Sequence, residues 1–77
     1  MVKEFIIFIE SIGFKRSDGF VFRYDYKEFL IDLGNSHCEF YNGSEWIKYL
    51  SYYDDLETIE KYFKKELRSI KLKQLLR

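Results

Sequence analysis

The strongest constraint on the fold is an alternation of side chains over residues 19–34, GFVFRYDYKEFLIDLG. Large apolar side chains take every second position on both sides of a central turn: Phe20, Phe22, Tyr24, Phe29, Ile31 and Leu33. Successive side chains of a strand point to opposite faces, so this pattern predicts a β-hairpin with one buried face. A turn at Tyr26 and Lys27 gives the cross-strand pairs Tyr24–Phe29, Phe22–Ile31 and Phe20–Leu33.

A second hairpin is predicted from HCEFYNGSEWIKYL, residues 37–50, in which Asn42-Gly43 is a favoured two-residue turn. This turn pairs Tyr41 with Ser44, Glu39 with Trp46 and His37 with Lys48. The side chains then assigned to the core are Cys38, Phe40, Ile47 and Tyr49. The outer face of the sheet would carry Val21, Arg23, Leu30, Asp32, His37, Glu39, Tyr41, Trp46, Lys48 and Leu50.

Two helices flank these strands. Helical spacing of apolar residues predicts the first over about residues 2–12, ending at Gly13 as a left-handed cap with Phe14 beside it. The second is predicted over about residues 55–74, with Asp54 as N-cap and Glu57 completing a capping box. Its apolar stripe is Leu56, Ile59, Phe63, Leu67 and Ile70.

The predicted fold class is α+β, a small single domain over residues 1–77 with the order α-β-β-β-β-α. The strands are expected at about residues 19–25, 28–33, 37–41 and 45–51. They form an antiparallel four-stranded meander with two helices packed on one face. The other face then has no cover.

Composition limits how such a domain is stabilised. Seventy-seven residues are near the lower end for a fold held by its core alone, and aromatic residues make up 21% of the chain. Cys38 is the only cysteine, so no internal disulfide forms, and with a single His37 no metal site is expected. Neither Ala nor Pro occurs, a bias that suggests an AT-rich genome, such as that of a low-GC bacterium or its phage.

Catalysis is not expected. His37 and Cys38 are adjacent on a strand, so their side chains point to opposite faces and cannot form a nucleophile–base pair. No motif for a cofactor, nucleotide or metal occurs in the chain. The apolar run from Phe5 to Ile9 is too short for a membrane span or a signal peptide, so we expect a soluble, cytoplasmic protein.

The outer sheet face is the first candidate for function. An ordinary solvated face is one explanation of its composition, because long charged side chains can shield exposed aromatic rings. A contact surface is the other, since Trp, Tyr and Arg are the residues enriched in interface hot spots. The predicted contact residues are Arg23, Tyr41, Trp46 and Lys48. On this interpretation the chain is a non-enzymatic protein-binding module, an inhibitor that occludes a larger partner protein such as a host-defence factor.

The C-terminal segment carries two further candidates. Residues 1–56 hold six Lys/Arg against ten Asp/Glu, whereas residues 57–77 hold seven against three, so the chain is polarised from −4 to +4. Nucleic-acid binding is the alternative function, through Lys61, Lys64, Lys65, Arg68 and Lys71. A solvated basic face is the simpler explanation of the same residues. Self-association into a homodimer is predicted through Leu72, Leu75 and Leu76, unless the helix breaks near Ile70.

Overall fold

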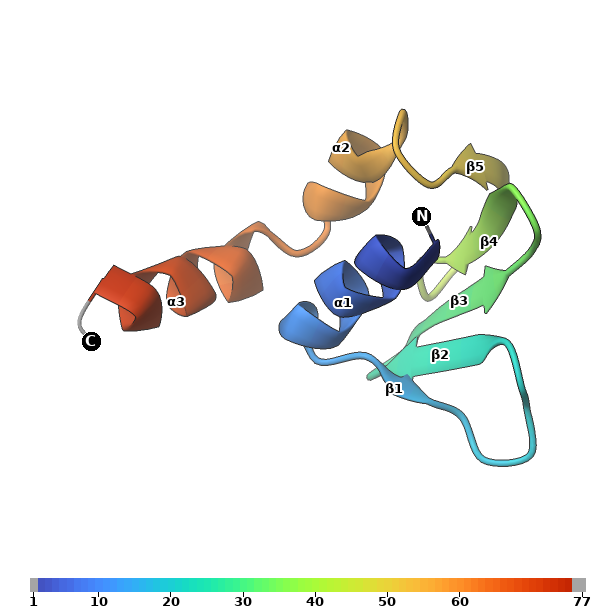
Figure 1. The fold of residues 1–77 in the computed structure, drawn as a ribbon, viewed down its shortest axis with the longest axis horizontal. Coiled ribbons are helices and arrows are strands. Elements are labelled where there is room, and N and C mark those ends of the chain that lie inside the picture. Colours follow the sequence, from blue (N-terminus) through green and yellow to red (C-terminus); the bar gives the residue numbers. More distant parts are fainter. Residues whose placement is uncertain (1, 76–77) are drawn as a thin grey trace.

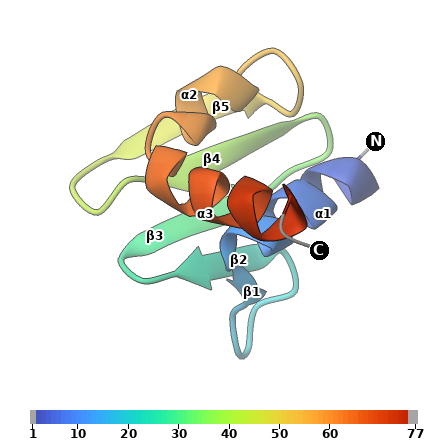
Figure 2. The same cartoon turned by 90° about the vertical axis from the view of Figure 1, so that its left-hand side faces the viewer.

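The computed structural model describes residues 2–75, except for the side chains of residues 71, 74 and 75. Its elements are α1 Val2–Ile12, β1 Lys15–Arg16, β2 Arg23–Tyr26, β3 Phe29–Leu33, β4 His37–Tyr41, β5 Trp46–Ser51, α2 Leu56–Glu60 and α3 Lys64–Leu75. The five strands form one antiparallel sheet in the order β1-β2-β3-β4-β5. Figures 1 and 2 show the helices on one side of this sheet. The predicted α+β class is confirmed, with five strands in place of four.

The core lies between the sheet and the helices. Its buried side chains are Phe5, Ile9, Ile12, Phe14, Tyr24, Ile31, Cys38, Phe40, Leu50, Tyr52, Ile59 and Phe63. Phe63 is at the centre of an aromatic group, with its ring centroid 4.8 Å from that of Phe29 and 5.4 Å from that of Phe14. Within the described residues, no helix has the length and apolar character needed to cross a membrane.

The end of α1 follows the prediction. Gly13 has a φ of 131°, which a residue without Cβ adopts readily. The Phe14 N–H donates to the carbonyl of Ile9 at 3.1 Å, and the Gly13 N–H donates to that of Glu10 at 3.1 Å. This is the Schellman arrangement, and it directs Phe14 into the core.

The predicted register of the first hairpin is wrong by two residues. Tyr26 pairs with Phe29 and Tyr24 with Ile31, because the turn lies at Lys27 and Glu28 rather than at Tyr26 and Lys27. Tyr26 is excluded from the turn because its ring packs on Phe14 (5.7 Å) and Phe63 (6.1 Å). A shift of two residues keeps the two faces of the hairpin unchanged, so the buried side chains of β2 and β3 were predicted correctly.

That shift removes Phe20 and Phe22 from the sheet, and their predicted burial is wrong. β2 begins at Arg23, and residues 17–22 form a loop that returns from the short strand β1. Figure 1 shows this loop projecting from the body of the domain. Phe20, Val21 and Phe22 are 52%, 69% and 65% exposed.

The second hairpin also departs from its predicted register. Asn42-Gly43 does not form a two-residue turn, because the Asn42 side chain accepts hydrogen bonds from the N–H groups of Ser44 (2.9 Å) and Glu45 (3.0 Å). The loop therefore has four residues, and Tyr41 pairs with Trp46.

A β-bulge then changes the faces of β5. The register shifts between Cys38 and Phe40, and on β5 Tyr49 has a φ of 61°. Tyr49, predicted to be in the core, is 76% exposed, whereas Leu50, predicted to be on the outer face, is buried.

The single helix predicted over residues 55–74 is two helices. α2 ends at Glu60, α3 begins at Lys64, and the N–H of Phe63 donates to the carbonyl of Glu60 at 2.9 Å in a tighter turn between them. Adjacent residues of a straight helix point about 100° apart. Here the rings of Tyr62 and Phe63 both pack on Phe40, with centroid distances of 5.3 and 6.1 Å.

The predicted N-cap, Asp54, is also wrong. The N-cap of α2 is Asp55. Its carboxylate accepts a hydrogen bond from the Ser51 N–H instead of from an N–H of α2.

Candidate functional site

The face of the sheet opposite the helices carries a group of side chains in mutual contact. We call Phe20, Arg23, Asp32, Tyr41 and Trp46 the outer sheet surface. Alternation fixes the direction of the strand residues, because their neighbours Tyr24, Ile31 and Phe40 are buried on the helix side. Phe20 joins the group from the loop before β2.

Arg23 is the centre of this surface. Its Nε donates to Oδ1 of Asp32 at 2.6 Å and its Nη2 donates to Oδ2 at 2.9 Å, a bidentate pair across β2 and β3. The pKa of Arg23 is raised, chiefly by this hydrogen bond. The two side chains are 30% and 31% exposed. The pair therefore fixes the guanidinium in one position at the surface.

Two aromatic rings face that guanidinium. Its carbon lies 4.6 Å from the ring centroid of Phe20 and 5.8 Å from that of Trp46. β2 and β5 are three strand spacings apart, about 14 Å. The Arg23 and Trp46 side chains must therefore extend toward each other across β3 and β4. Tyr41 packs beside the indole at 5.3 Å, so the contacts run without a break from the loop to β5.

Three of the four predicted contact residues are thus brought together, namely Arg23, Tyr41 and Trp46. Lys48 is exposed at the bulge of β5. It takes no part in the ring and ion-pair contacts of the outer sheet surface among the described residues. Phe20 was missed as a surface residue. A cross-strand Arg23–Asp32 ion pair would have given the correct register from the sequence, and with it the position of Phe20.

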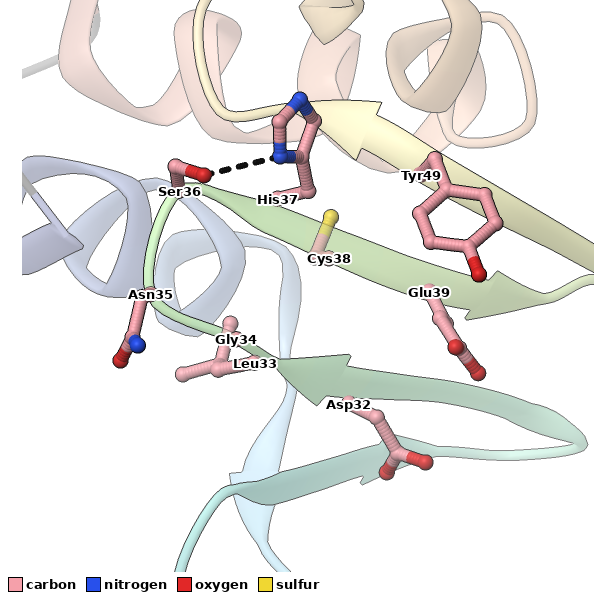
Figure 3. Close-up of a pocket in the computed structure, with 9 residues that line it drawn as sticks. All are labelled: Asp32, Leu33, Gly34, Asn35, Ser36, His37, Cys38, Glu39 and Tyr49. Carbon is pink, nitrogen blue, oxygen red and sulfur yellow. Dashed lines mark hydrogen bonds between the residues drawn. The ribbon is translucent and has the colours of Figure 1, made fainter.

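A hollow of about 370 Å³ adjoins this surface where β3, β4 and the loop between them meet. Figure 3 shows its lining residues, with Glu39 and Asp32 on neighbouring strands and Tyr49 on β5. His37 Nδ1 is 2.9 Å from Ser36 Oγ. In the described part of the chain, no three His, Cys, Asp or Glu side chains are grouped in a way that could hold a metal ion.

The Cys38 thiol is not arranged for nucleophilic chemistry. Cys38 is buried, and burial, together with the nearby charge of Asp55, raises its pKa to about 12. His37, its neighbour on β4, is exposed. The thiol therefore stays protonated at neutral pH, and the imidazole does not serve as its base.

The basic side chains of the alternative interface lie around the break between α2 and α3. Lys61, Lys64, Lys65 and Arg68 are exposed, and the Lys71 side chain lies outside the described residues. Lys61, Lys64 and Arg68 line a hollow of about 500 Å³, but Glu57 and Glu60 line it as well. The positive charge of this region is therefore partly offset where the helices meet.

The predicted self-association site is only partly described. Leu72 is 59% exposed on α3, whereas the Leu75 side chain and Leu76 lie outside the described residues. Figure 1 shows α3 extending away from the sheet.

Comparisons with known proteins add no assignment. The chain matches no protein-family model, and neither the curated proteins nor the solved structures contain a significant match to it.

Proposed function

We propose that this chain is a non-enzymatic protein-binding module that docks on a larger partner protein through its outer sheet surface. The observation that carries this proposal is the unbroken contact from Phe20 through Arg23 to Trp46 and Tyr41, on the face of the sheet opposite the helices (Figure 1). Trp, Tyr and Arg in well-packed positions are the residues that dominate binding energy at protein interfaces.

The ion pair with Asp32 supports this function physically. A side chain already held in its bound position loses less conformational entropy when a partner docks. Arg23 is held by two hydrogen bonds and lies against two rings, so binding needs little further ordering of it. Trp46 is the anchor in this proposal, and the module acts by steric occlusion, as an inhibitor that covers a functional surface of its partner, such as a host-defence factor.

Affinity capture from the source organism tests the proposal. Wild-type protein, Trp46→Ala and Tyr53→Ala are used as baits, and retained proteins are quantified by mass spectrometry. Tyr53 is a matched control because it is an aromatic residue, 48% exposed, outside the outer sheet surface. We expect a partner retained by the wild type and by Tyr53→Ala, and a loss of at least tenfold with Trp46→Ala. Equal retention by all three baits would contradict the proposal.

Fluorescence gives a second measurement. Trp46 is the only tryptophan of the chain. Titration with the captured partner should therefore shift its emission to shorter wavelength as the indole loses contact with water. A saturable complex that leaves the emission unchanged would place the interface elsewhere.

Nucleic-acid binding through Lys61, Lys64, Lys65, Arg68 and Lys71 is the second candidate, favoured by the exposure of the first four. Retention on DNA or RNA that falls steeply with salt would support it, since each phosphate contact releases counterions. The double variant Lys64→Ala/Arg68→Ala should then lower both the affinity and the slope of its salt dependence. No retention at low salt would exclude this function.

A further inference from the structure

The loop before β2 and the α1 helix together form an apolar patch. It adjoins the outer sheet surface, because Val21, Phe22 and Leu33 also line a hollow with Phe20, Arg23 and Asp32. A hollow of about 370 Å³ lies there, and six of its nine lining residues are apolar: Val2, Ile6, Val21, Phe22, Tyr24 and Leu33. Phe22 forms one wall of this hollow and is nevertheless 65% exposed. A projecting ring and an apolar hollow therefore lie next to each other in the same patch.

The backbone holds the projecting ring in place. The carbonyl of Phe22 accepts the Leu33 N–H at 2.8 Å, and the carbonyl of Arg23 accepts the Ser17 N–H at 2.8 Å. Both ends of the exposed segment are thus bonded to neighbouring elements. Little ordering is needed before Phe22 can enter a complementary surface.

We propose that this patch is a weak symmetric dimer interface, in which Phe22 of each copy covers the hollow of the other. A two-fold interface brings the same patch of both copies together, so the patch must be complementary to itself. A ring beside a hollow meets this condition.

Charge also favours a second copy over other occupants. Among the described residues that line the hollow, Arg16 is the only charged one, and Asp18 in the loop that follows it has the opposite sign. Two copies therefore meet without net repulsion, whereas a nucleic acid would need a positive patch. An aromatic residue buries on the order of 150–250 Å². The patch offers one such ring, the smaller side chain of Val21 and the hollow. The apolar area that it can bury is therefore below the roughly 800 Å² that each partner of a stable complex buries. The interface is accordingly of the weak, transient class.

Sedimentation velocity of the full chain tests this. The mass should rise from 9.5 kDa toward that of a dimer, and no further, as concentration increases from about 10 µM to 1 mM. Phe22→Ser should stay at 9.5 kDa over the whole range. Its circular dichroism should match the wild type, because the replaced ring is exposed. Leu72→Ser is the matched control: it removes another exposed apolar side chain, outside the patch, and should dimerise as the wild type does.

NMR of a mixture of labelled and unlabelled chains identifies the contact directly. We expect intermolecular NOEs from the Phe22 ring to the methyl groups of Val2 and Ile6. Four results would overturn the proposal: a monomeric mass for the wild type at 1 mM, a mass above that of the dimer, a dimeric mass for Phe22→Ser, or a monomeric mass for Leu72→Ser. The last would assign self-association to the C-terminal tail.

Discussion

Replacement of Phe63 by alanine tests the packing that the break between α2 and α3 makes possible. Phe63 is fully buried, and its ring lies within 6.1 Å of the rings of Phe14, Tyr26, Phe29 and Phe40. An aromatic side chain that buries about 150–250 Å² contributes about 4–6 kcal/mol at 25 cal/mol per Å². Alanine keeps part of this burial but leaves a cavity, so we expect a loss of about 3–5 kcal/mol.

That loss is large for so small a domain. Seventy-seven residues at about 0.05–0.15 kcal/mol each give a total stability of about 4–12 kcal/mol. Urea unfolding followed by circular dichroism measures the change. With a slope near 1–2 kcal/mol per molar, the midpoint should fall by about 1.5–5 M. If Phe63→Ala does not fold, Phe63→Leu, with an expected cost of about 1.5 kcal/mol, gives a measurable midpoint.

Phe20→Ala is the matched control. It removes the same side chain from an exposed position and should cost less than about 1 kcal/mol. Alternation along the sequence had assigned Phe20 to the core. If the two alanine variants lose equal stability, the assignment of Phe63 to the core and Phe20 to the surface is refuted.

Three further variants or conditions test single positions. Gly13→Ala should lower the free energy of unfolding by about 1–3 kcal/mol, because the position has a positive φ and a Cβ would lie 2.7 Å from the Tyr26 ring; an unchanged melting temperature would contradict this cap. Burial raises the pKa of Cys38 from 9.0 to about 12. The buried, protonated thiol therefore contributes its full stabilisation below pH 9, and this stabilisation is lost as the pH rises toward 12. Correspondingly, a thiol reagent at pH 8 should label native Cys38 at least tenfold more slowly than urea-unfolded protein, and equal rates would show that the thiol is accessible. Tyr52→Phe should cost about 1 kcal/mol in thermal unfolding, because the hydroxyl that donates to the carbonyl of Gly34 is removed; a neutral result would mean that water replaces it.

Local sequence signals determined α1, the strands β3, β4 and β5, and most of the faces, but not β1 or the division between α2 and α3. The α1 helix and its end at Gly13 depend on contacts within a few residues, and they were predicted correctly. The buried faces of β2, β3 and β4 also follow from the sequence, because alternation does not change when the register shifts by two residues. The same argument placed Arg23, Tyr41 and Trp46 on the uncovered face.

Register, bulge and helix break were decided by tertiary contacts. Tyr26 enters the strand because Phe14 and Phe63, far from it in sequence, pack on its ring. Leu50 becomes buried and Tyr49 exposed because a bulge on β5 changes which residue faces the helices. Alternation alone does not decide the register of the first hairpin, since both registers satisfy it equally well, and only the cross-strand pair of Arg23 with Asp32 distinguishes them.

The sequence alone therefore determined a small α+β domain whose sheet has helices on one face and none on the other. The reason is that the periodicity of apolar residues shows which side chains are turned away from water. Only the tertiary structure decided that Phe20 joins Arg23 and Trp46 at the surface, and that Phe22 projects beside an apolar hollow. The physical reason is that a core of limited volume accepts the best-packing set of aromatic rings. Rings that do not fit, here Phe20 and Phe22, remain exposed and available for contacts.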